Sequence, residues 1–325
     1  MFQAKSGEKE QKYLARGGLL LHNAGDMLQA TDVTGDLLKA VSRSFYLTIR
    51  FLPMQMRPAI ALGYMLARAT DSVADTSSAE AQKRVEVLHA MAAVIAGHSE
   101  QVPALMQVLQ QEIAPGLSHE SEKTLLCEFA ACLQALETFD AVQRALIRKV
   151  LSIIIEGQVW DLVAFGEHHT VQNDEETHTY TYRVAGCVGE FWTDLGYATM
   201  GDAFCTPARR ELMTQAGIRY GKGLQLINIL RDMEEDAARG RCYLCSDPDK
   251  WLNRAERYMN DGLDYSRRLG TFKLRFASML PALIGKKTIQ LLRKTTLGQG
   301  KVKIKRFAVY ACLLKAVFLS LRGKA

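Results

Sequence analysis

The chain has 325 residues, enough for one large domain or two small ones and for a substantial hydrophobic core. Apolar residues make up 48% of it and charged residues 23%, which excludes a disordered or fibrous protein and is typical of a soluble globular one. The net charge of +6 is unevenly distributed along the chain. Residues 265–325 contain fifteen Lys or Arg and no Asp or Glu, whereas residues 1–264 contain 26 Lys or Arg and 35 Asp or Glu.

The N-terminal segment has mixed charge, and the apolar patch Leu19–Leu21 is too short for the core of a signal peptide. We expect a cytoplasmic protein, or one peripheral to the inner face of a membrane, with residues 1–30 loosely ordered. The odd number of cysteines, seven, favours reduced thiols over a disulfide framework.

Long helical patterns dominate the rest, and breaks between them are short. Strand alternation and hairpin signals are scarce. The sequence therefore predicts an all-α fold of eight or more helices packed as one domain over residues 1–325, with basic helices in 265–325.

The first distinctive helix is predicted over residues 58–75. Tyr64, Arg68, Asp71 and Asp75 follow one another at offsets of 4, 3 and 4, so they share one face of a helix. Apolar residues cover most of the remaining surface, which indicates that this helix is buried along most of its length.

The stretch 153–165 (IIIEGQVWDLVAF) is apolar except for Glu156, Gln158 and Asp161. It is suited to the wall of an apolar cavity, although for any one of its apolar residues ordinary core packing is the favoured interpretation. Further along, 166–178 is polar and rich in turn residues, and its histidines, His178 among them, are expected in a solvated loop.

A second acidic helix is predicted within Gly223–Leu244. Asn228, Asp232 and Asp236 stand four residues apart and form one stripe, and the apolar residues between 224 and 230 point in nearly all directions, as in a buried helix. Carboxylate and amide oxygens suit Mg²⁺. A solvated face of salt bridges is the ordinary alternative for one such helix.

Two buried acidic helices are harder to explain as solvated faces. Facing carboxylates repel unless cations compensate them. We therefore predict that the two stripes face each other across a cavity mouth and are bridged by Mg²⁺ and a diphosphate.

The basic tail ends in an apolar run, 307–321, that is too short and too polar to span a bilayer. It has no nucleic-acid reader motif, so we expect no nucleic acid as partner. Diphosphate substrates, an anionic membrane surface or simple solvation each account for its charge.

Five motifs together resemble the squalene/phytoene synthase family of head-to-head prenyl transferases. Asp71–Asp75 (DSVAD) and Asn228–Asp236 (NILRDMEED) resemble the two aspartate-rich motifs of that family. The others are Ser42–Phe45 (SRSF), Tyr180–Gly189 (YTYRVAGCVG) and Gly240–Leu244 (GRCYL). They stand in the order of the family and cover residues from about 40 to 245, with Thr181 and Cys245 as departures from its usual Cys and Pro.

The resemblance implies an isoprenoid-synthase helical bundle with a central apolar cavity. It assigns about two or three Mg²⁺ ions to Asp71, Asp75, Asn228, Asp232 and Asp236. It assigns diphosphate binding to Arg68, Arg231 and Arg241, and further substrate contacts to Ser42, Arg43, Ser44, Phe45, Tyr64, Gln225 and Tyr243. Tyr180 is the implied residue for proton transfer, and Asn228 and Arg231 are implied to contact cofactor. Gly157, Gln158, Asp161 and Leu162 resemble a GQxxDL pattern of bacterial members, without an assigned role.

The implied reaction joins two farnesyl diphosphates through presqualene diphosphate to squalene, with NADPH as reductant, in a monomer or weak dimer. Dehydrosqualene and phytoene synthases are the alternatives within the family. A non-catalytic, membrane-associated assembly factor with the same fold is the alternative of another class, but such a protein should have lost acids from one motif, and all four aspartates are present.

Overall fold

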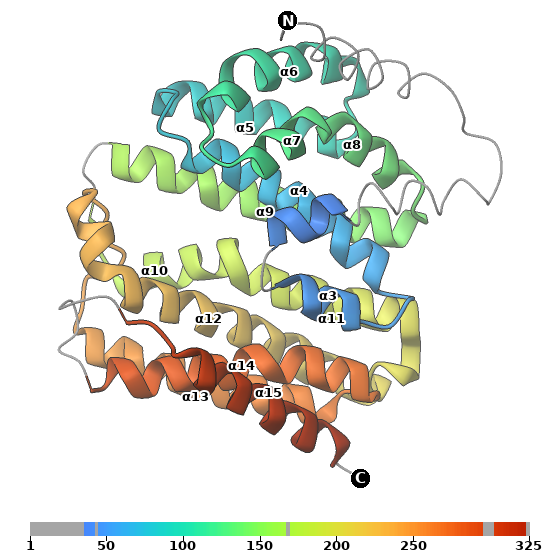
Figure 1. The fold of residues 1–325 in the computed structure, drawn as a ribbon, viewed down its shortest axis with the longest axis vertical. Coiled ribbons are helices and arrows are strands. Elements are labelled where there is room, and N and C mark those ends of the chain that lie inside the picture. The colour runs from blue at the N-terminus through green and yellow to red at the C-terminus, as the bar shows by residue number, and fades with distance from the viewer. Residues whose placement is uncertain (1–35, 43–44, 167–169, 295–301, 323–325) are drawn as a thin grey trace, which may run out of the picture.

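The computed structural model describes residues 36–42, 45–166, 170–294 and 302–322. Within these ranges the chain is almost entirely helical (Figure 1), which confirms the predicted all-α class. An isolated bridge between Thr170 and Cys242 is the only β contact in the described part. Residues 1–30, expected to be loosely ordered, lie outside these ranges.

Residues 36–42 form a helical turn that precedes the named helices. These are α3 (Phe45–Phe51), α4 (Arg57–Asp75), α5 (Ala81–Ala96), α6 (Val102–Val108), α7 (Glu120–Cys127), α8 (Phe129–Glu137), α9 (Ala141–Gly166), α10 (Asp174–Thr181), α11 (Cys187–Met200), α12 (Arg210–Ala238), α13 (Pro248–Arg268), α14 (Phe272–Leu292) and α15 (Arg306–Leu321). A π-helical turn, η4 (Tyr182–Gly186), joins α10 to α11.

Two clusters of buried apolar side chains hold these helices together. The first lies mainly among α4 to α9 and α11, and it also includes residues of α3 and of α12 to α14. The second lies mainly among α12 to α15 and includes Phe165 of α9 and Tyr180 of α10. Figure 1 shows α4 to α9 in the upper part of the molecule and α12 to α15 in the lower part. Helices α9, α10 and α11 lie where the two parts meet.

Helix α4 follows the predicted pattern closely. Pro58 stands in its first turn, where its missing N–H costs nothing, and the helix ends at Asp75 because Thr76 is extended. Eleven of its nineteen residues are buried, as the sequence predicted. The last turn therefore carries Asp71 and Asp75 out of the core.

Helices α11 and α12 approach each other through glycine. A Cβ atom added to Gly189 would lie 2.0 Å from the carbonyl oxygen of Gly217, so no larger residue fits without separating the helices. A Cβ atom on Gly221 would lie 2.2 Å from the carbonyl oxygen of Ala185 in η4. Gly189 of the YTYRVAGCVG motif therefore sets the distance between α11 and α12.

The basic C-terminal segment is helical where it is described, as predicted. It comprises the end of α13, all of α14 and α15. Arg275 of α14 ties α15 down, because its Nε donates a hydrogen bond of 2.8 Å to the carbonyl oxygen of Ser320.

Candidate active site

The last turns of α4 carry the first set of predicted site residues. Arg68 Nη2 donates a hydrogen bond of 2.5 Å to Glu122 Oε1, and Arg68 Nη1 lies 4.0 Å from Asp71 Oδ2. Tyr64 Oη lies 3.4 Å from the carbonyl oxygen of Val41, which links α4 to the preceding helical turn. The guanidinium group of Arg68 is thus held beside the aspartates by an acid from α7.

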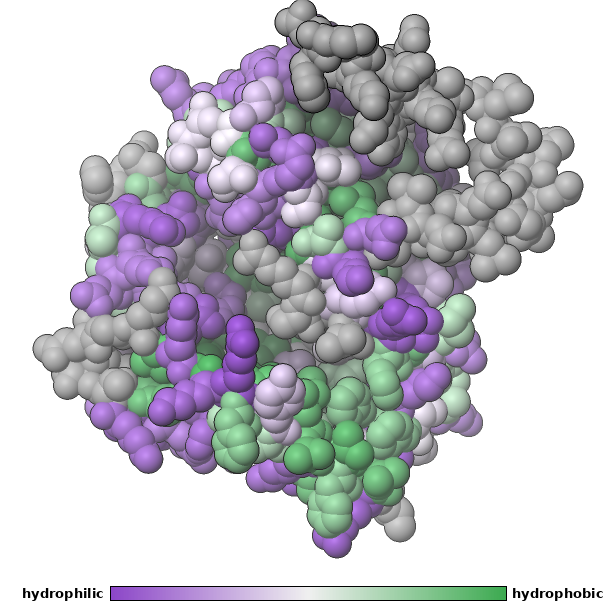
Figure 2. All heavy atoms as spheres, viewed as in Figure 1, coloured by the Kyte–Doolittle hydropathy of each residue, from purple (hydrophilic) through white to green (hydrophobic). Residues whose placement is uncertain are grey.

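Asp71 has an unfavourable environment for a carboxylate. Burial raises its pKa to about 6, the charge of Asp75 acts in the same direction, and Arg68 and the hydrogen bond from Gln158 act against them. Its side chain is nevertheless 46% exposed. A solvent-accessible carboxyl group with protein on most sides is what we expect in a recess, and Figure 2 shows the surface hollowed between the upper and lower parts of the molecule.

Gln158 of α9 reaches the same carboxyl group. Its Nε2 donates a hydrogen bond of 2.6 Å to Asp71 Oδ1, whereas its Oε1 is buried without a hydrogen-bond partner. An unsatisfied buried amide oxygen costs about 1–3 kcal/mol. This side of the site therefore has an oxygen available for a ligand.

The second stripe lies on α12, as predicted. Asn228 is exposed and Asp232 and Asp236 are partly exposed, while Ile229 and Leu230 between them are buried. The prediction that this part of the helix is buried all round was therefore wrong. The stripe stays open because α12 packs its other faces on α10, α11, α13 and α14.

Side chains along this stripe contact one another. Arg231 Nε donates a hydrogen bond of 2.8 Å to Asp232 Oδ1, and Asn228 Nδ2 lies 3.4 Å from Gln225 Oε1. Burial raises the pKa of Asp236 to about 6, Asp232 adds to this shift, and Arg241 opposes it. Each stripe thus contains one carboxyl group whose negative charge is poorly compensated.

The turn after α12 brings Arg241 back over the helix end. Gly240 has φ +76°, a conformation that glycine adopts at no steric cost, and the amide of Arg241 donates a hydrogen bond of 2.8 Å to the carbonyl oxygen of Asp236. Arg241 Nη1 then lies 3.3 Å from Asp161 Oδ2 of α9. The GRCYL motif therefore joins the end of α12 to α9.

Tyr180 and Tyr243 form an aromatic wall next to Asp161. Their rings stack with centroids 4.8 Å apart, Trp160 lies 5.4 Å from Tyr180, and Tyr243 Oη donates a hydrogen bond of 2.7 Å to Asp161 Oδ1. Phe165 packs edge-on against Tyr243 at 4.9 Å. Burial, followed by the charge of Asp161, raises the pKa of Tyr180 well above its ordinary value, so this side chain is a neutral phenol.

The two stripes meet around Asp161 and Arg241. Asp75 of the first stripe and Asp161 both act on the pKa of Arg241, while Asp161 and Arg241 both act on that of Asp236 in the second. Charges act on one another in this way only over short distances. The ends of α4 and α12, more than 150 residues apart in the sequence, therefore share one electrostatic environment. A bridge of Mg²⁺ and diphosphate between them stays a prediction.

Arg84, at the start of α5, belongs to the same environment. Its Nη1 donates a hydrogen bond of 2.6 Å to the carbonyl oxygen of Ala74, and its Nε is buried without a partner. Burial lowers its pKa, as does the charge of Arg241, whereas Asp75 and Asp161 act in the opposite direction. One N–H of this guanidinium is free to meet an acceptor.

The residues fit Mg²⁺ in their chemistry. Each stripe offers two carboxylates, burial and then the neighbouring carboxylate raise the pKa of one in each pair, and Gln158 Oε1 has no partner. No three acidic, His or Cys side chains converge on one point anywhere in the described residues. This arrangement does not suit an all-protein cage, but it does suit an ion held by one or two carboxylates with water and phosphate oxygens.

The SRSF motif lies only partly within the described residues. Ser42 is buried, and its Oγ donates a hydrogen bond of 2.5 Å to the carbonyl oxygen of Leu38, so it is bound within its own helical turn. Arg43 and Ser44 lie outside the described residues, and Phe45 begins α3.

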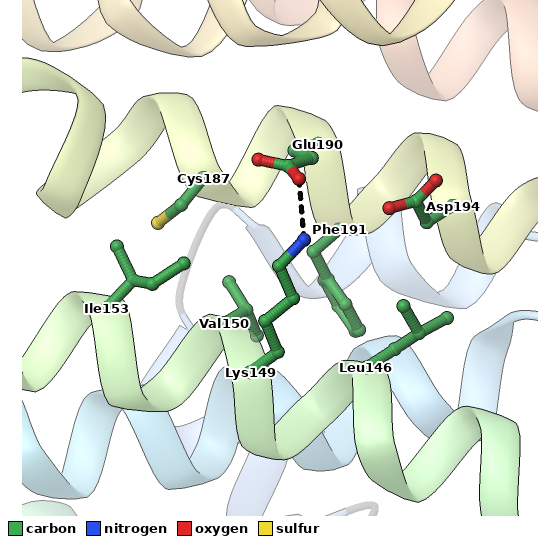
Figure 3. A pocket seen from close by; sticks show the side chains of 8 residues that line it. All are labelled: Leu146, Lys149, Val150, Ile153, Cys187, Glu190, Phe191 and Asp194. Atoms are coloured by element: carbon green, nitrogen blue, oxygen red, sulfur yellow. Dashed lines mark hydrogen bonds and ion pairs between the residues drawn. The ribbon is translucent and has the colours of Figure 1, made fainter. Parts of the chain in front are cut away.

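A small, shallow pocket lies between α9 and α11, lined by none of the residues of either stripe (Figure 3). Lys149 and Glu190 face each other across it, 2.6 Å apart from Nζ to Oε1, and Cys187 and Phe191 contribute to its lining. None of the predicted site residues lines this pocket. It is therefore not the candidate site.

Four residues that contribute to the site had no role assigned to them from the sequence. Gln158 and Asp161 carried a signal, because they are polar in an otherwise apolar segment. Glu122 and Arg84 carried none, since each comes from a different helix outside the motifs. His178 is also placed differently from the prediction: it lies in α10 with its ring 5.0 Å from that of Trp251, not in a loop.

Sequence comparison places the chain in a known family. The family model for squalene/phytoene synthase matches residues 38–253. A bifunctional lycopene cyclase/phytoene synthase of Blakeslea trispora is 26% identical over 228 residues, which cover 69% of this chain and 33% of the relative. The presqualene diphosphate synthase of Zymomonas mobilis is 26% identical over 228 residues, covering 68% of this chain and 62% of that protein. The chain thus spans about a third of the length of the first curated relatives it matches.

Solved structures have the same fold. The complex of TcSQS with the ligand E5700 superposes with a TM-score of 0.70 at 20% identity and covers 90% of this chain and 88% of that one. The squalene synthase HpnC from Alicyclobacillus acidocaldarius gives a TM-score of 0.54 at 15% identity, covering 86% and 98%. At these identities the likeness shows the fold alone.

Proposed function

The chain belongs to the squalene/phytoene synthase family, and we propose that it is a prenyltransferase that joins two isoprenyl diphosphates head to head. The observation that carries this proposal is the meeting of two aspartate stripes and several arginines beside an aromatic wall. A charged diphosphate and a hydrocarbon chain require these two environments side by side.

The charged half would bind the leaving diphosphate. Arg84 has a free buried N–H, and Arg241 lies between the stripes, so both are placed to donate to phosphate oxygens. Arg68 and Arg231 hold carboxylate partners, which a diphosphate could replace. Mg²⁺ bound between the aspartates and the diphosphate would neutralise the leaving group.

The aromatic half would protect the carbocation. Tyr180, Tyr243, Trp160 and Phe165 form a wall that excludes water and offers ring faces to positive charge. Because Tyr180 is a neutral phenol, it would act as a hydrogen-bond donor and pass on a proton only together with an acceptor such as a diphosphate oxygen. Asp161 and Tyr243 would hold its ring in position.

We propose farnesyl diphosphate as substrate and squalene as product. The condensation of two farnesyl diphosphates would release one diphosphate and one proton and leave presqualene diphosphate. Loss of the second diphosphate, with a hydride from NADPH, would then give squalene. The match to a presqualene diphosphate synthase and the fold shared with squalene synthases over most of the chain support this choice.

Phytoene synthesis is the second candidate. It would join two geranylgeranyl diphosphates and requires no hydride donor. The phytoene synthases among the relatives favour it, including the 15-cis-phytoene synthase of Synechococcus elongatus, which is 37% identical over 112 residues covering 34% of this chain and 35% of that protein.

The test is incubation of the purified chain with Mg²⁺ and either farnesyl or geranylgeranyl diphosphate, with and without NADPH. Analysis of the extract should show squalene, and without NADPH presqualene diphosphate. Phytoene from geranylgeranyl diphosphate would support the second candidate. Dehydrosqualene from farnesyl diphosphate would show that the protein does not carry out the reduction with NADPH. No product from either substrate would refute the proposed activity and favour a non-catalytic assembly factor.

A further inference from the structure

Helix α15 has apolar residues on two opposite sides. On one side Ala316 and Ser320 are buried against the rest of the molecule, and Ser320 is held by Arg275. On the other side six large apolar residues face solvent: Phe307, Tyr310, Leu314, Val317, Phe318 and Leu321. At about 100° per residue these six fall within an arc of about 100°. We call this arc the outer face of α15.

The exposure of the outer face is unusually high. Phe307 is 84% exposed, Leu314 74% and Leu321 69%. Scattered single apolar residues are normal on a soluble protein, but a contiguous apolar patch marks an interaction surface. Figure 2 shows this apolar area over the lower part of the molecule, where α14 and α15 lie.

Helix α3 carries a further exposed aromatic side chain. Phe51, at the end of α3, is exposed, and its ring lies 5.0 Å from that of Phe276 in α14. Phe276 follows Arg275, whose side chain holds the C-terminal end of α15. Helix α14 thus contacts α3 through Phe276 and the C-terminal end of α15 through Arg275.

Basic residues border the outer face. On the helical wheel Arg306 lies at one edge of the arc, and Lys315 and Arg322 lie at the other, all three exposed. The guanidinium carbon of Arg322 lies 4.0 Å from the ring centroid of Phe318. No acidic residue occurs from Tyr265 to the end of the sequence, so nothing on this segment offsets the positive charge.

We propose that the outer face of α15 binds the surface of an anionic lipid bilayer, with the helix lying in the plane of the membrane. Aromatic and aliphatic side chains on one face with basic residues at its edges are the pattern of interfacial helices. No helix of the described part is long and apolar enough to cross a bilayer. The positive charge adds attraction to anionic headgroups.

A second copy of the chain fits this surface less well. In a two-fold dimer the same patch meets itself, which would bring Arg306, Lys315 and Arg322 of one copy towards those of the other. No acidic residue of this segment could compensate that repulsion. A bilayer with anionic headgroups instead supplies the missing negative charge.

The test uses the full-length chain and flotation with lipid vesicles of two compositions, phosphatidylcholine alone and phosphatidylcholine with phosphatidylglycerol. We expect binding to the anionic vesicles that weakens as salt is raised, and much weaker binding to the neutral ones. The double variant Leu314→Ser/Phe318→Ser should bind anionic vesicles at least about tenfold more weakly, because it removes apolar surface that the membrane would bury. The triple variant Arg306→Gln/Lys315→Gln/Arg322→Gln should lose most of the salt dependence.

The matched control is Leu212→Ser, which removes a 50% exposed leucine from α12, outside the patch. It should bind as the wild type does. The unfolding temperatures of all variants should stay within a few degrees of that of the wild type, because substitutions at exposed positions change the stability little.

Three results would overturn the proposal. The first is no binding of the wild-type chain to anionic vesicles at low salt. The second is equal binding by the double variant. The third is a dimer in solution that Leu314→Ser converts to a monomer, which would identify a second copy as the occupant of the face.

Discussion

Replacing Asp71 by Asn should stabilise the ligand-free protein at neutral pH. The new side chain keeps an oxygen that accepts from Gln158, and Arg68 keeps Glu122 as its partner, so the main change is one of charge. In the wild type, burial and then the charge of Asp75 raise the pKa of Asp71 from 3.8 to about 6. The folded protein therefore binds this proton more tightly than the unfolded chain does, and its stability falls as the pH rises through this range.

The size of the effect follows from the shift and the exposure. A shift of about two pKa units corresponds to about 3 kcal/mol for a group fully shielded from water. The Asp71 side chain is 46% exposed, so screening by solvent reduces the difference to about 1 kcal/mol. In a protein of this size, that is about 2 °C in the unfolding temperature.

The assay is thermal unfolding in a metal chelator from about pH 4 to pH 8, reported as variant minus wild type. The difference should be near zero at the acid end and reach about +2 °C above pH 6, where the wild-type carboxyl group is charged. Asp264→Asn is the control, because that carboxylate is 59% exposed and pairs with Arg267 at 2.7 Å. It should show no such pH-dependent gain.

Added Mg²⁺ and inorganic diphosphate provide a second reading of the same variant. They should raise the unfolding temperature of the wild type more than that of Asp71→Asn. A ligand stabilises the folded state to which it binds, and the variant lacks one of the carboxylates proposed to bind Mg²⁺. A variant that is less stable than the wild type at pH 7 would refute the reasoning, since Asp71 would then stabilise the fold rather than strain it.

Three further variants test other parts of the structure. Asp232→Asn should reduce turnover by at least about a hundredfold with an unchanged circular dichroism spectrum, and a near wild-type rate would remove the second stripe from the site. Arg84→Met should raise the KM for the diphosphate substrate about tenfold or more while the fold is preserved, and an unchanged KM would show that its free N–H does not meet substrate. Gly189→Val should destabilise the protein by about 3 kcal/mol or more because α11 cannot then approach α12, and an unfolding temperature equal to that of the wild type would contradict the close packing.

The helical repeat predicts the residues of each stripe but not their exposure. Asp71 and Asp75 on α4, and Asn228, Asp232 and Asp236 on α12, lie where the helical repeat predicts, because side chains four residues apart share a face of any α-helix. Periodicity could not tell which face stays open. The apolar residues around Asn228 suggested burial all round, yet the stripe is exposed, since exposure depends on which other helices pack against α12.

The partners of the motif residues could not be predicted in the same way. Arg68 pairs with Glu122, Asp71 with Gln158, and Arg241 with Asp161, and each pair joins segments far apart in the sequence. Gln158 and Asp161 at least stood out as polar positions in an apolar segment. Arg84 did not, because an arginine in the first turn of a helix is common and only its lack of an acceptor in the folded protein marks it.

Residue types and their spacing predict the helical class, the two acidic helix faces, the basic C-terminal segment and the family that the motifs resemble. These features are local, since they depend on residue type and on spacing along one helix. The packing of the helices brings the charges of Asp161 and Arg241 close enough to act on Asp236, and that of Asp75 close enough to act on Arg241. It also leaves six apolar side chains of α15 exposed to solvent instead of buried in the core. These facts depend on how helices pack, and packing is a property of surfaces brought together from distant parts of the chain.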